Sequence, residues 1–252
     1  MRGLSSLEQN LLRRSAVGDI LVRSAARHPN RRVLRFRDKT YTFRELNDAV
    51  NRCAHGLMKL GIEKGDRAAI VCHNCDHYLI YWWALMKIGA VITPVNWMLR
   101  GEEIKYIVDH SGSKILCVED ALIPNVLDIK DKVPSVRTFG YINLTGARVP
   151  EGWMNIEELW RDEYPAVEPE VEINHDDLAA LLYTSGTEAA PKGVMNTHLN
   201  FVSSMASAQV DILIAGNVSP HRRQIRAVAV NLVALFVAGI VAPRQIDATA
   251  QV

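Results

Sequence analysis

Residues 183–194 hold the densest group of chemically useful side chains in this sequence, reading Tyr-Thr-Ser-Gly-Thr-Glu-Ala-Ala-Pro-Lys-Gly-Val. They follow an apolar run at residues 178–182, which the pattern predicts to be a buried strand. Glycines let the backbone approach a ligand, and hydroxyls and backbone N–H groups donate to phosphate oxygens. Lys192 adds a mobile positive charge. The stretch therefore predicts a loop that binds an anion, and a polyphosphate suits this chemistry best.

The spacing from Gly186 to Lys192 is also that of a Walker loop, but the neighbours of the lysine differ. A Walker loop has glycine before the lysine and serine or threonine after it, whereas Pro191 and Gly193 stand there in this chain. The phosphate contacts must therefore be arranged differently. A structural alternative is a Ser/Gly-rich turn before a helix, and the order of the flanking elements decides between the two readings.

The stretch closely resembles the phosphate-loop signature of the adenylate-forming superfamily, usually Tyr-Thr-Ser-Gly-Thr-Thr-Gly-x-Pro-Lys-Gly. This superfamily includes acyl-CoA synthetases, luciferases and the adenylation domains of peptide synthetases. The chain departs from the signature at Glu188 and Ala189, and Glu188 places a negative charge where a triphosphate would lie. The resemblance implies a set of nucleotide-binding residues: Thr184, Ser185, Gly186, Thr187, Glu188, Lys192 and Gly193.

Four further stretches resemble the same superfamily in order and rough spacing. They are residues 41–46 (Tyr-Thr-Phe-Arg-Glu-Leu), 65–67 (Gly-Asp-Arg), 87–96 (Lys-Ile-Gly-Ala-Val-Ile-Thr-Pro-Val-Asn) and 197–200 (Thr-His-Leu-Asn). The Pro-Val-Asn ending of the third is more typical of acyl-CoA ligases than of peptide-synthetase adenylation domains. Each stretch is weak by itself, and together they support the resemblance.

Short apolar strands and helical segments alternate through the first half of the chain. Strands are expected at residues 67–71, 90–93 and 114–118, with Pro94 ending the second, and helices at 43–60, 76–87 and 101–110. Thr42 and Glu45 form a capping box before the first helix, and the helix at 76–87 is apolar nearly all round, which indicates burial. A hairpin is expected at 33–42, a short strand at 137–139 and a small helix at 156–160.

This alternation predicts an α/β fold with mostly parallel sheets and flanking helices. The resemblance implies the N-terminal portion of the large domain of an acyl-CoA synthetase. We expect an N-terminal α/β subdomain with a connecting excursion at residues 1–175 and the start of a second α/β subdomain at 176–252. His175 precedes two aspartates, and we interpret this group as a solvated turn.

Four cysteines, at positions 53, 72, 75 and 117, lie in otherwise apolar surroundings, which indicates reduced, buried thiols. The sequence Cys72-His73-Asn74-Cys75-Asp76-His77 could hold a metal or act in redox chemistry. There is no second Cys/His pair at zinc-finger spacing, and the first cysteine ends a strand pattern. We therefore interpret the segment as a strand-to-helix turn with structural thiols, and predict no metal site.

The composition is that of an ordinary globular protein: 252 residues, 48% hydrophobic, 23% charged, and a formal net charge of +1. This balance gives no reason to expect nucleic acid or an anionic membrane as a partner. The first residues lack the apolar core of a secretory signal, so a cytoplasmic location is expected. The apolar run at 227–242 contains Asn231 and is too short for a typical membrane span, so we interpret it as a buried segment.

The resemblance implies an acyl-CoA synthetase that uses ATP, Mg²⁺ and coenzyme A and acts on a small-molecule carboxylic acid of the fatty-acid type. In such enzymes the carboxylate attacks the α-phosphate, pyrophosphate leaves, and the acyl group passes from the adenylate to coenzyme A. The chain covers only about the first half of the family's length, so we expect a truncated or divergent form that is inactive alone and able to self-associate. No catalytic residue can be named. The alternative is a non-catalytic fold remnant that binds nucleotide or associates with other subunits.

Overall fold

The computed structural model describes residues 5–184 and 191–214. The chain as a whole divides into two compact units, Met1–Leu199 and Asn200–Val252. The helices are α1 (Ser6–Arg13), α2 (Gly18–Arg27), α3 (Phe43–Lys59), α4 (Asp76–Lys87), α5 (Gly101–Ser111) and α6 (His198–Ile214), with 3₁₀ helices η1 (Asp120–Asn125), η2 (Leu127–Lys132) and η3 (Ile156–Trp160). The strands are β1 (Arg32–Phe36), β2 (Lys39–Thr42), β3 (Arg67–Val71), β4 (Val91–Val95), β5 (Ile115–Glu119), β6 (Thr138–Ile142), β7 (Met154–Asn155), β8 (Leu178–Thr184) and β9 (Lys192–Thr197).

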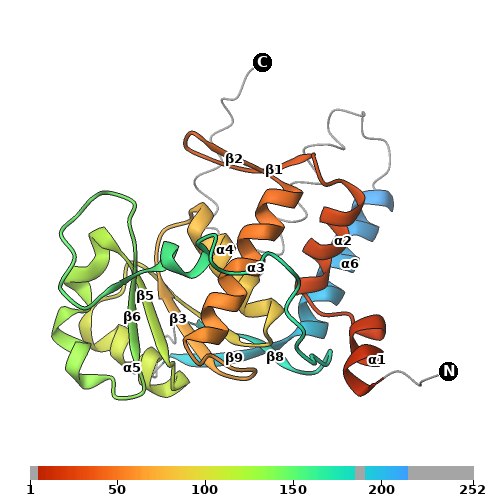
Figure 1. Ribbon diagram of the computed structural model, residues 1–252. Coiled ribbons are helices and arrows are strands. Elements are labelled where there is room, and N and C mark those ends of the chain that lie inside the picture. Colours follow the sequence, from red (N-terminus) through yellow and green to blue (C-terminus); the bar gives the residue numbers. More distant parts are fainter. Residues whose placement is uncertain (1–4, 185–190, 215–252) are drawn as a thin grey trace. The chain divides into compact units, whose positions relative to one another are not determined.

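The main sheet of the first unit has seven strands in the order β7-β6-β5-β3-β4-β8-β9 (Figure 1). Every neighbouring pair is parallel except β8 and β9, which form an antiparallel hairpin. Strands β1 and β2 form a separate two-stranded sheet. The predicted α/β fold with a mostly parallel sheet is therefore confirmed. The boundary expected between residues 175 and 176 stays a prediction.

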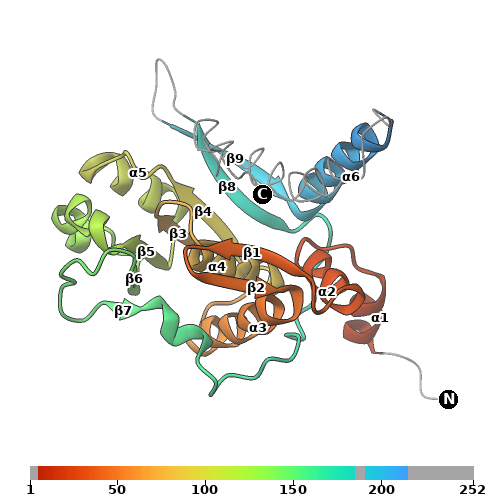
Figure 2. The ribbon, with the colours of Figure 1, turned by 90° about the horizontal axis from the view of Figure 1, so that it is seen from above.

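The strand order requires helices on both faces of the sheet. The chain passes from β3 to β4 in one direction and then returns across β3 to reach β5. Right-handed crossovers in opposite directions lie on opposite faces, which places α4 on one face and α5 on the other. Figure 2 shows this arrangement, with α5 on the side of β3 and β4 that is away from α3. At such a reversal the carboxyl ends of the strands border a natural ligand crevice.

Alternating strand residues fill two separate apolar layers. Ala69, Val71, Leu116 and Val118 pack with the buried face of α5 and with η1 and η2. The intervening strand residues point to the opposite face, because successive side chains of a strand alternate. There α3 and α4 pack against each other, and Tyr81 and Leu85 of α4 are fully buried. The nearly all-round apolar character of this helix thus reflects burial, as the sequence predicted.

The local sequence explains where several elements begin and end. Thr42 accepts a hydrogen bond from the Glu45 backbone N–H while the Glu45 carboxylate accepts one from the Thr42 backbone, which is the predicted capping box of α3. Gly112 ends α5 in the left-handed conformation, with a φ of 61°. The small helix predicted at 156–160 is present as the 3₁₀ helix η3.

Strand β4 corrects one expectation, because it continues through Pro94 to Val95 instead of ending at Thr93. Proline has no N–H to donate to a strand neighbour. Strand β8 is in register with β4 only at Ile92↔Ala180, whereas β3 follows β4 along its whole length. Beyond Ile92, β4 therefore pairs with a neighbouring strand on one side only. A proline, which lacks a backbone N–H, is tolerated there because the other side has no strand partner to accept a hydrogen bond.

A buried lysine attaches the connecting excursion to the main helices. Lys87 Nζ donates to Asn47 Oδ1 at 2.8 Å, to Asn51 Oδ1 at 2.7 Å and to Glu168 Oε2 at 2.5 Å. Asn51 Nδ2 also donates to the Ala166 carbonyl. Burial lowers the pKa of Lys87, and the charge of Glu168 opposes this shift. The network fixes residues 166–168 against α3 and α4.

Helix α6 begins in the first unit and continues in the second as far as Ile214. In the part of the chain that the structure describes, no helix is both long and apolar enough to cross a membrane. The apolar run at 227–242, interpreted from the sequence as a buried segment, lies outside the described residues.

Candidate functional site

The predicted phosphate motif includes the end of β8 and the start of β9, which pair as an antiparallel hairpin (Figure 2). The last residue pair of the hairpin is Thr184↔Lys192, and both residues are exposed. Because directly opposed residues of an antiparallel pair point to the same face, the hydroxyl and the ammonium group lie on one side of the hairpin. The predicted site residues Ser185, Gly186, Thr187 and Glu188 lie outside the described residues.

Gly193 follows Lys192 and lies opposite Tyr183. A Cβ atom at Gly193 would lie 3.2 Å from Cζ of the Tyr183 ring, so the ring occupies the space that a side chain would need. The glycine of the motif therefore leaves room for the Tyr183 ring on the face of the hairpin opposite Thr184 and Lys192. In this structure Gly193 has a packing role beside its predicted ligand-binding role.

Helix α5 contacts both arms of the hairpin through two aromatic side chains. Nδ1 of His110 lies 2.7 Å from the Tyr183 hydroxyl, and the Tyr106 hydroxyl donates to the Pro191 carbonyl at 3.1 Å. The rings of Tyr106 and His110 are stacked, with centroids 5.5 Å apart. Burial raises the pKa of Tyr183, so its phenol stays protonated and can donate to the imidazole. We call Tyr106, His110 and Tyr183 the α5 anchor.

Sequence reasoning missed the α5 anchor. Tyr106 and His110 are four residues apart and therefore lie on the same face of α5, but nothing in the sequence indicates which strand that face meets. A hollow of about 580 Å³ runs beside the anchor and is lined by Glu102, Lys105, Tyr106, Asp109 and His110. Lys105 and Asp109 form an ion pair across one turn of the helix, at 2.8 Å.

The motif Thr-His-Leu-Asn at 197–200 holds the far end of the hairpin in place. His198 is fully buried, and its Nδ1 accepts a hydrogen bond from the Val17 backbone N–H at 3.2 Å. The backbone N–H of His198 donates to the Asp177 carbonyl, and that of Leu199 donates to the His175 carbonyl. Burial lowers the pKa of His198 to about 4, so the ring is neutral and can accept at Nδ1. This histidine is a structural link to the N-terminal helices.

The group at 175–177 is mainly a solvated turn, as the sequence predicted for its histidine. His175 and Asp176 have exposed side chains and lie 3.2 Å apart. Asp177 instead accepts from the Asn174 backbone N–H and pairs with Lys64 at 2.6 Å. It therefore fixes the approach to β8.

Residues 72–75 form the turn between β3 and α4, which confirms the predicted strand-to-helix turn. All four cysteines are buried and free. His77 bridges two carboxylates, with Nδ1 2.7 Å from Asp76 Oδ1 and Nε2 2.5 Å from Glu157 Oε1. Asp76 Oδ2 also accepts from the Tyr41 hydroxyl at 2.7 Å. The carboxylates thus hold the imidazole in a fixed orientation.

The contacts of His77 and Asp76 determine the protonation state of both side chains. Burial disfavours a protonated His77, but its bonds to Asp76, Cys75 and Glu157 raise its pKa to about 10. Burial likewise disfavours an ionised Asp76, yet the bonds from His77 and Tyr41 lower its pKa to about 2. An imidazolium and a carboxylate are therefore the stable forms at neutral pH.

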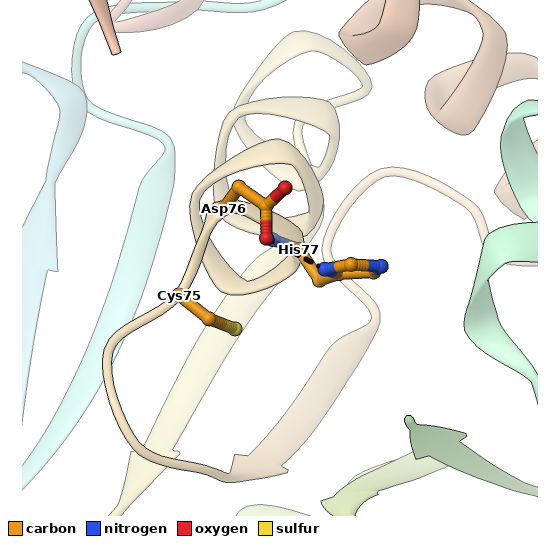
Figure 3. Close-up of side chains that lie close together, drawn as sticks. All are labelled: Cys75, Asp76 and His77. Atoms are coloured by element: carbon orange, nitrogen blue, oxygen red, sulfur yellow. Dashed lines mark hydrogen bonds and ion pairs between the residues drawn. The ribbon is translucent and has the colours of Figure 1, made fainter. Parts of the chain in front are cut away.

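Cys75, Asp76 and His77 offer ligand atoms that all lie within 4.8 Å of one another (Figure 3). A thiolate, a carboxylate and an imidazole form a donor set that Zn²⁺ accepts. However, both nitrogens of His77 and both oxygens of Asp76 are already paired with protein groups. Cys75 Sγ also accepts from the Tyr78 backbone N–H at 3.3 Å. We therefore assign no metal to this group.

The mostly parallel α/β fold of this chain matches that of solved CoA ligases. The chain belongs to the family described as AMP-binding enzyme, which it matches over residues 21–239. The resemblance read from the motifs is thereby confirmed.

Curated relatives include the crotonobetaine/carnitine–CoA ligases of Salmonella agona (strain SL483) and Salmonella typhimurium (strain LT2). Each is 32% identical to this chain over 164 residues, which is 64% of this chain and 31% of the relative. The chain thus spans about a third of the length of these ligases.

Two solved structures show the same fold. The inhibitor-bound N-terminal domain of FACL13 from Mycobacterium tuberculosis has a TM-score of 0.66 and 31% identity, covering 78% of this chain and 47% of that one. The anthranilate CoA ligase AuaEII, solved with anthranoyl-AMP, has a TM-score of 0.71 and 23% identity, covering 78% of this chain and 36% of that one. At that identity the second comparison supports the fold alone.

Proposed function

We propose that this chain is part of an acyl-CoA synthetase that activates a carboxylic acid with ATP and transfers the acyl group to coenzyme A. The observation that carries the proposal is the Thr184↔Lys192 pair, which presents a hydroxyl and an ammonium group together where the family signature lies. The membership of the AMP-binding family and the CoA ligases among the relatives support this reaction type.

In this proposal the hairpin holds the β- and γ-phosphates of ATP. Thr184 donates its hydroxyl, Lys192 neutralises charge, and the predicted residues Ser185, Gly186, Thr187 and Gly193 supply further donors and room for the backbone. The exposed lysine and the threonine beside it fit a polyphosphate. Mg²⁺ accompanies the nucleotide, and Glu188 either faces away from the triphosphate or reaches the metal ion.

The chemistry in such a site is mostly a matter of position and charge. Attack of the carboxylate on the α-phosphate breaks the bond to pyrophosphate, and the leaving group carries the charge that Lys192 offsets. Holding the phosphates in one place also removes much of the entropic barrier to the attack. The α5 anchor contributes by fixing the two arms between which the phosphates lie.

We propose a carboxylic acid of the fatty-acid type as substrate and the cytoplasm as location. The crotonobetaine/carnitine–CoA ligases among the relatives support an organic acid as the substrate class. The 164 residues that match the curated ligases cover about a third of those ligases' length, so we expect acyl-CoA formation by this chain alone to fall below detection. Loss of one preorganised electrostatic group typically costs about 10²- to 10³-fold in rate, and the relatives' remaining length holds several such groups.

The decisive experiment is ATP–pyrophosphate exchange with a panel of carboxylic acids, run beside calorimetric titration of the chain with ATP and Mg²⁺. We expect ATP to bind, and we expect exchange only when the rest of a ligase is present in the same polypeptide. ATP binding without exchange in any such polypeptide would favour a non-catalytic nucleotide-binding protein. Absence of ATP binding would contradict the phosphate site itself. Light scattering on the same sample tests the expected self-association.

A further inference from the structure

Two cysteines at the turn between β3 and α4 lie close enough to react with each other. Cys72 Sγ and Cys75 Sγ are 3.8 Å apart. Both are close to the surface, with 6% and 8% of their area exposed, whereas Cys53 and Cys117 have 0% exposed. A disulfide needs the two sulfur atoms to approach to about 2 Å, so the two side chains must close the remaining gap. The chain thus contains one close pair of slightly exposed thiols, and the fully buried Cys53 and Cys117 serve as a comparison.

The surroundings distinguish the two thiols of the pair. Cys75 Sγ is the N-cap of α4 and accepts the Tyr78 backbone N–H at 3.3 Å, so the positive end of the helix faces it. Cys72 Sγ lies 3.0 Å from the His73 carbonyl and 3.8 Å from Cys75 Sγ, so its single proton has two acceptors within reach. The hydrogen bond with Cys72 and the nearby imidazolium of His77 lower the pKa of Cys75, while the same bond and burial raise the pKa of Cys72. Cys75 therefore ionises more readily than Cys72.

His77 supplies the positive charge because two carboxylates hold it. Asp76 contacts Nδ1, as Figure 3 shows, and Glu157 contacts Nε2. Together the two carboxylates stabilise the imidazolium near the Cys75 sulfur. A thiolate beside a histidine cation and a helix N-terminus is the usual environment of a reactive cysteine. Its neighbour Cys72 is placed as the resolving thiol.

We propose that Cys72 and Cys75 form an oxidation-sensitive dithiol, which hydrogen peroxide converts to an intrachain disulfide across the β3–α4 turn. In the first step the Cys75 thiolate attacks one peroxide oxygen, the O–O bond breaks, and hydroxide leaves, which gives a sulfenic acid at Cys75. In the second step the Cys72 sulfur attacks the Cys75 sulfur. The S–O bond breaks, and the hydroxyl group leaves with the Cys72 proton as water. The dithiol loses two electrons, and the peroxide gains them. This inference rests on the geometry of the turn and not on the proposed ligase activity.

Peptide mapping of the reduced 252-residue chain tests the proposal directly. Trypsin releases residues 68–87 as one peptide that contains both Cys72 and Cys75, whereas Cys53 and Cys117 fall in other peptides. After treatment with one equivalent of hydrogen peroxide and alkylation, we expect the 68–87 peptide to have lost two hydrogen atoms and to resist alkylation. Cys53 and Cys117 should remain reduced at a peroxide concentration at least tenfold higher. Equal oxidation of all four cysteines would overturn the proposal, and so would disulfides formed only between chains.

Two cysteine variants identify the attacking sulfur, and a glutamate variant tests the role of the charge. In Cys72→Ser, peroxide should leave a sulfenic acid at Cys75 that dimedone traps, whereas Cys75→Ser should give no adduct at Cys72. Glu157→Gln removes one of the charges that stabilise the His77 cation, and it should slow oxidation severalfold at pH 7 and shift the pH profile of the rate. Glu158→Gln, at the neighbouring position, is the control and should oxidise like the wild type. Stoichiometric zinc in the purified wild-type protein, protecting both cysteines from peroxide, would mean that the pair is a metal site instead.

Discussion

Nδ1 of His110 lies 2.7 Å from the hydroxyl of Tyr183, and this contact joins helix α5 to strand β8 at the first residue of the predicted phosphate motif. The two residues are 73 positions apart in the chain. The Tyr183 ring also covers Gly193, so one side chain links the helix to both strands of the hairpin. The described residues on either side of the loop are therefore held by a helix that contains none of the family's phosphate-loop residues.

Replacing Tyr183 with phenylalanine tests this link. The substitution removes the hydroxyl that contacts His110 and leaves the ring over Gly193. A hydrogen bond of this kind contributes about 0.5–1.5 kcal/mol, so we expect ATP affinity to fall about two- to tenfold by calorimetry. Tyr164→Phe is the control, because Tyr164 is remote in sequence from the hairpin and should bind ATP like the wild type. Unchanged ATP affinity in Tyr183→Phe would show that the anchor does not position the loop.

Lys192→Ala tests the charge at the site. If Lys192 contacts the triphosphate, its loss should weaken ATP binding by about 1.5–3 kcal/mol, which is typical of a charge-assisted contact. The melting temperature without ligand should not change, because Lys192 is exposed. Lys39→Ala removes another exposed lysine, whose contact with Glu157 is 3.8 Å long, and should leave ATP affinity unchanged. Equal ATP affinity in Lys192→Ala and wild type would exclude the proposed contact.

Lys87→Met tests the buried link to the connecting excursion. The change removes three hydrogen bonds and leaves Glu168, Asn47 and Asn51 without their shared donor. We expect the free energy of unfolding in urea to fall by about 2–3 kcal/mol, below the value for a fully buried ion pair because Glu168 is partly exposed. Lys64→Met breaks the more exposed pair with Asp177 and should cost about 1 kcal/mol or less. Similar losses in the two variants would contradict the role assigned to Lys87.

His198 predicts a pH dependence of stability. Its pKa is about 4 in the folded chain, whereas histidine in an unfolded chain has a pKa of about 6.5. The unfolded state therefore binds the extra proton between these values, and the free energy of unfolding falls as the pH falls from about 6.5 to 4. Integrated over this window, the loss amounts to about 3 kcal/mol.

The measurement is urea unfolding of the wild type and His198→Asn between pH 7 and pH 4. Asparagine retains an acceptor for the Val17 backbone N–H but does not titrate. The variant should therefore lack this part of the acid destabilisation, and the stability difference between the two proteins should shrink as the pH falls. Parallel curves for the two proteins would show that His198 does not titrate as expected.

The sequence by itself determined the elements and the family. Periodicity and capping residues located α3 and α4, because a helix start and an apolar face are local properties of the chain. The alternation of strands and helices indicated the parallel sheet, and the motif at 183–194 indicated the family. The predicted end of β4 at Thr93 was wrong. Whether a strand can continue through Pro94 depends on whether a neighbouring strand needs a backbone N–H at that position, and the sequence does not show this.

Only the tertiary structure decided how distant residues act on one another. Four residues that make long-range contacts lie in segments predicted from the sequence to be helices: Lys87, Tyr106, His110 and Glu157. No local pattern identifies their partners. The strand order brings α5 to the β8–β9 hairpin, and folding of the excursion brings Glu157 to His77. The charge state of the Cys75–His77 turn follows from that last contact, because an electrostatic shift depends on distance and burial in space and not on separation along the chain.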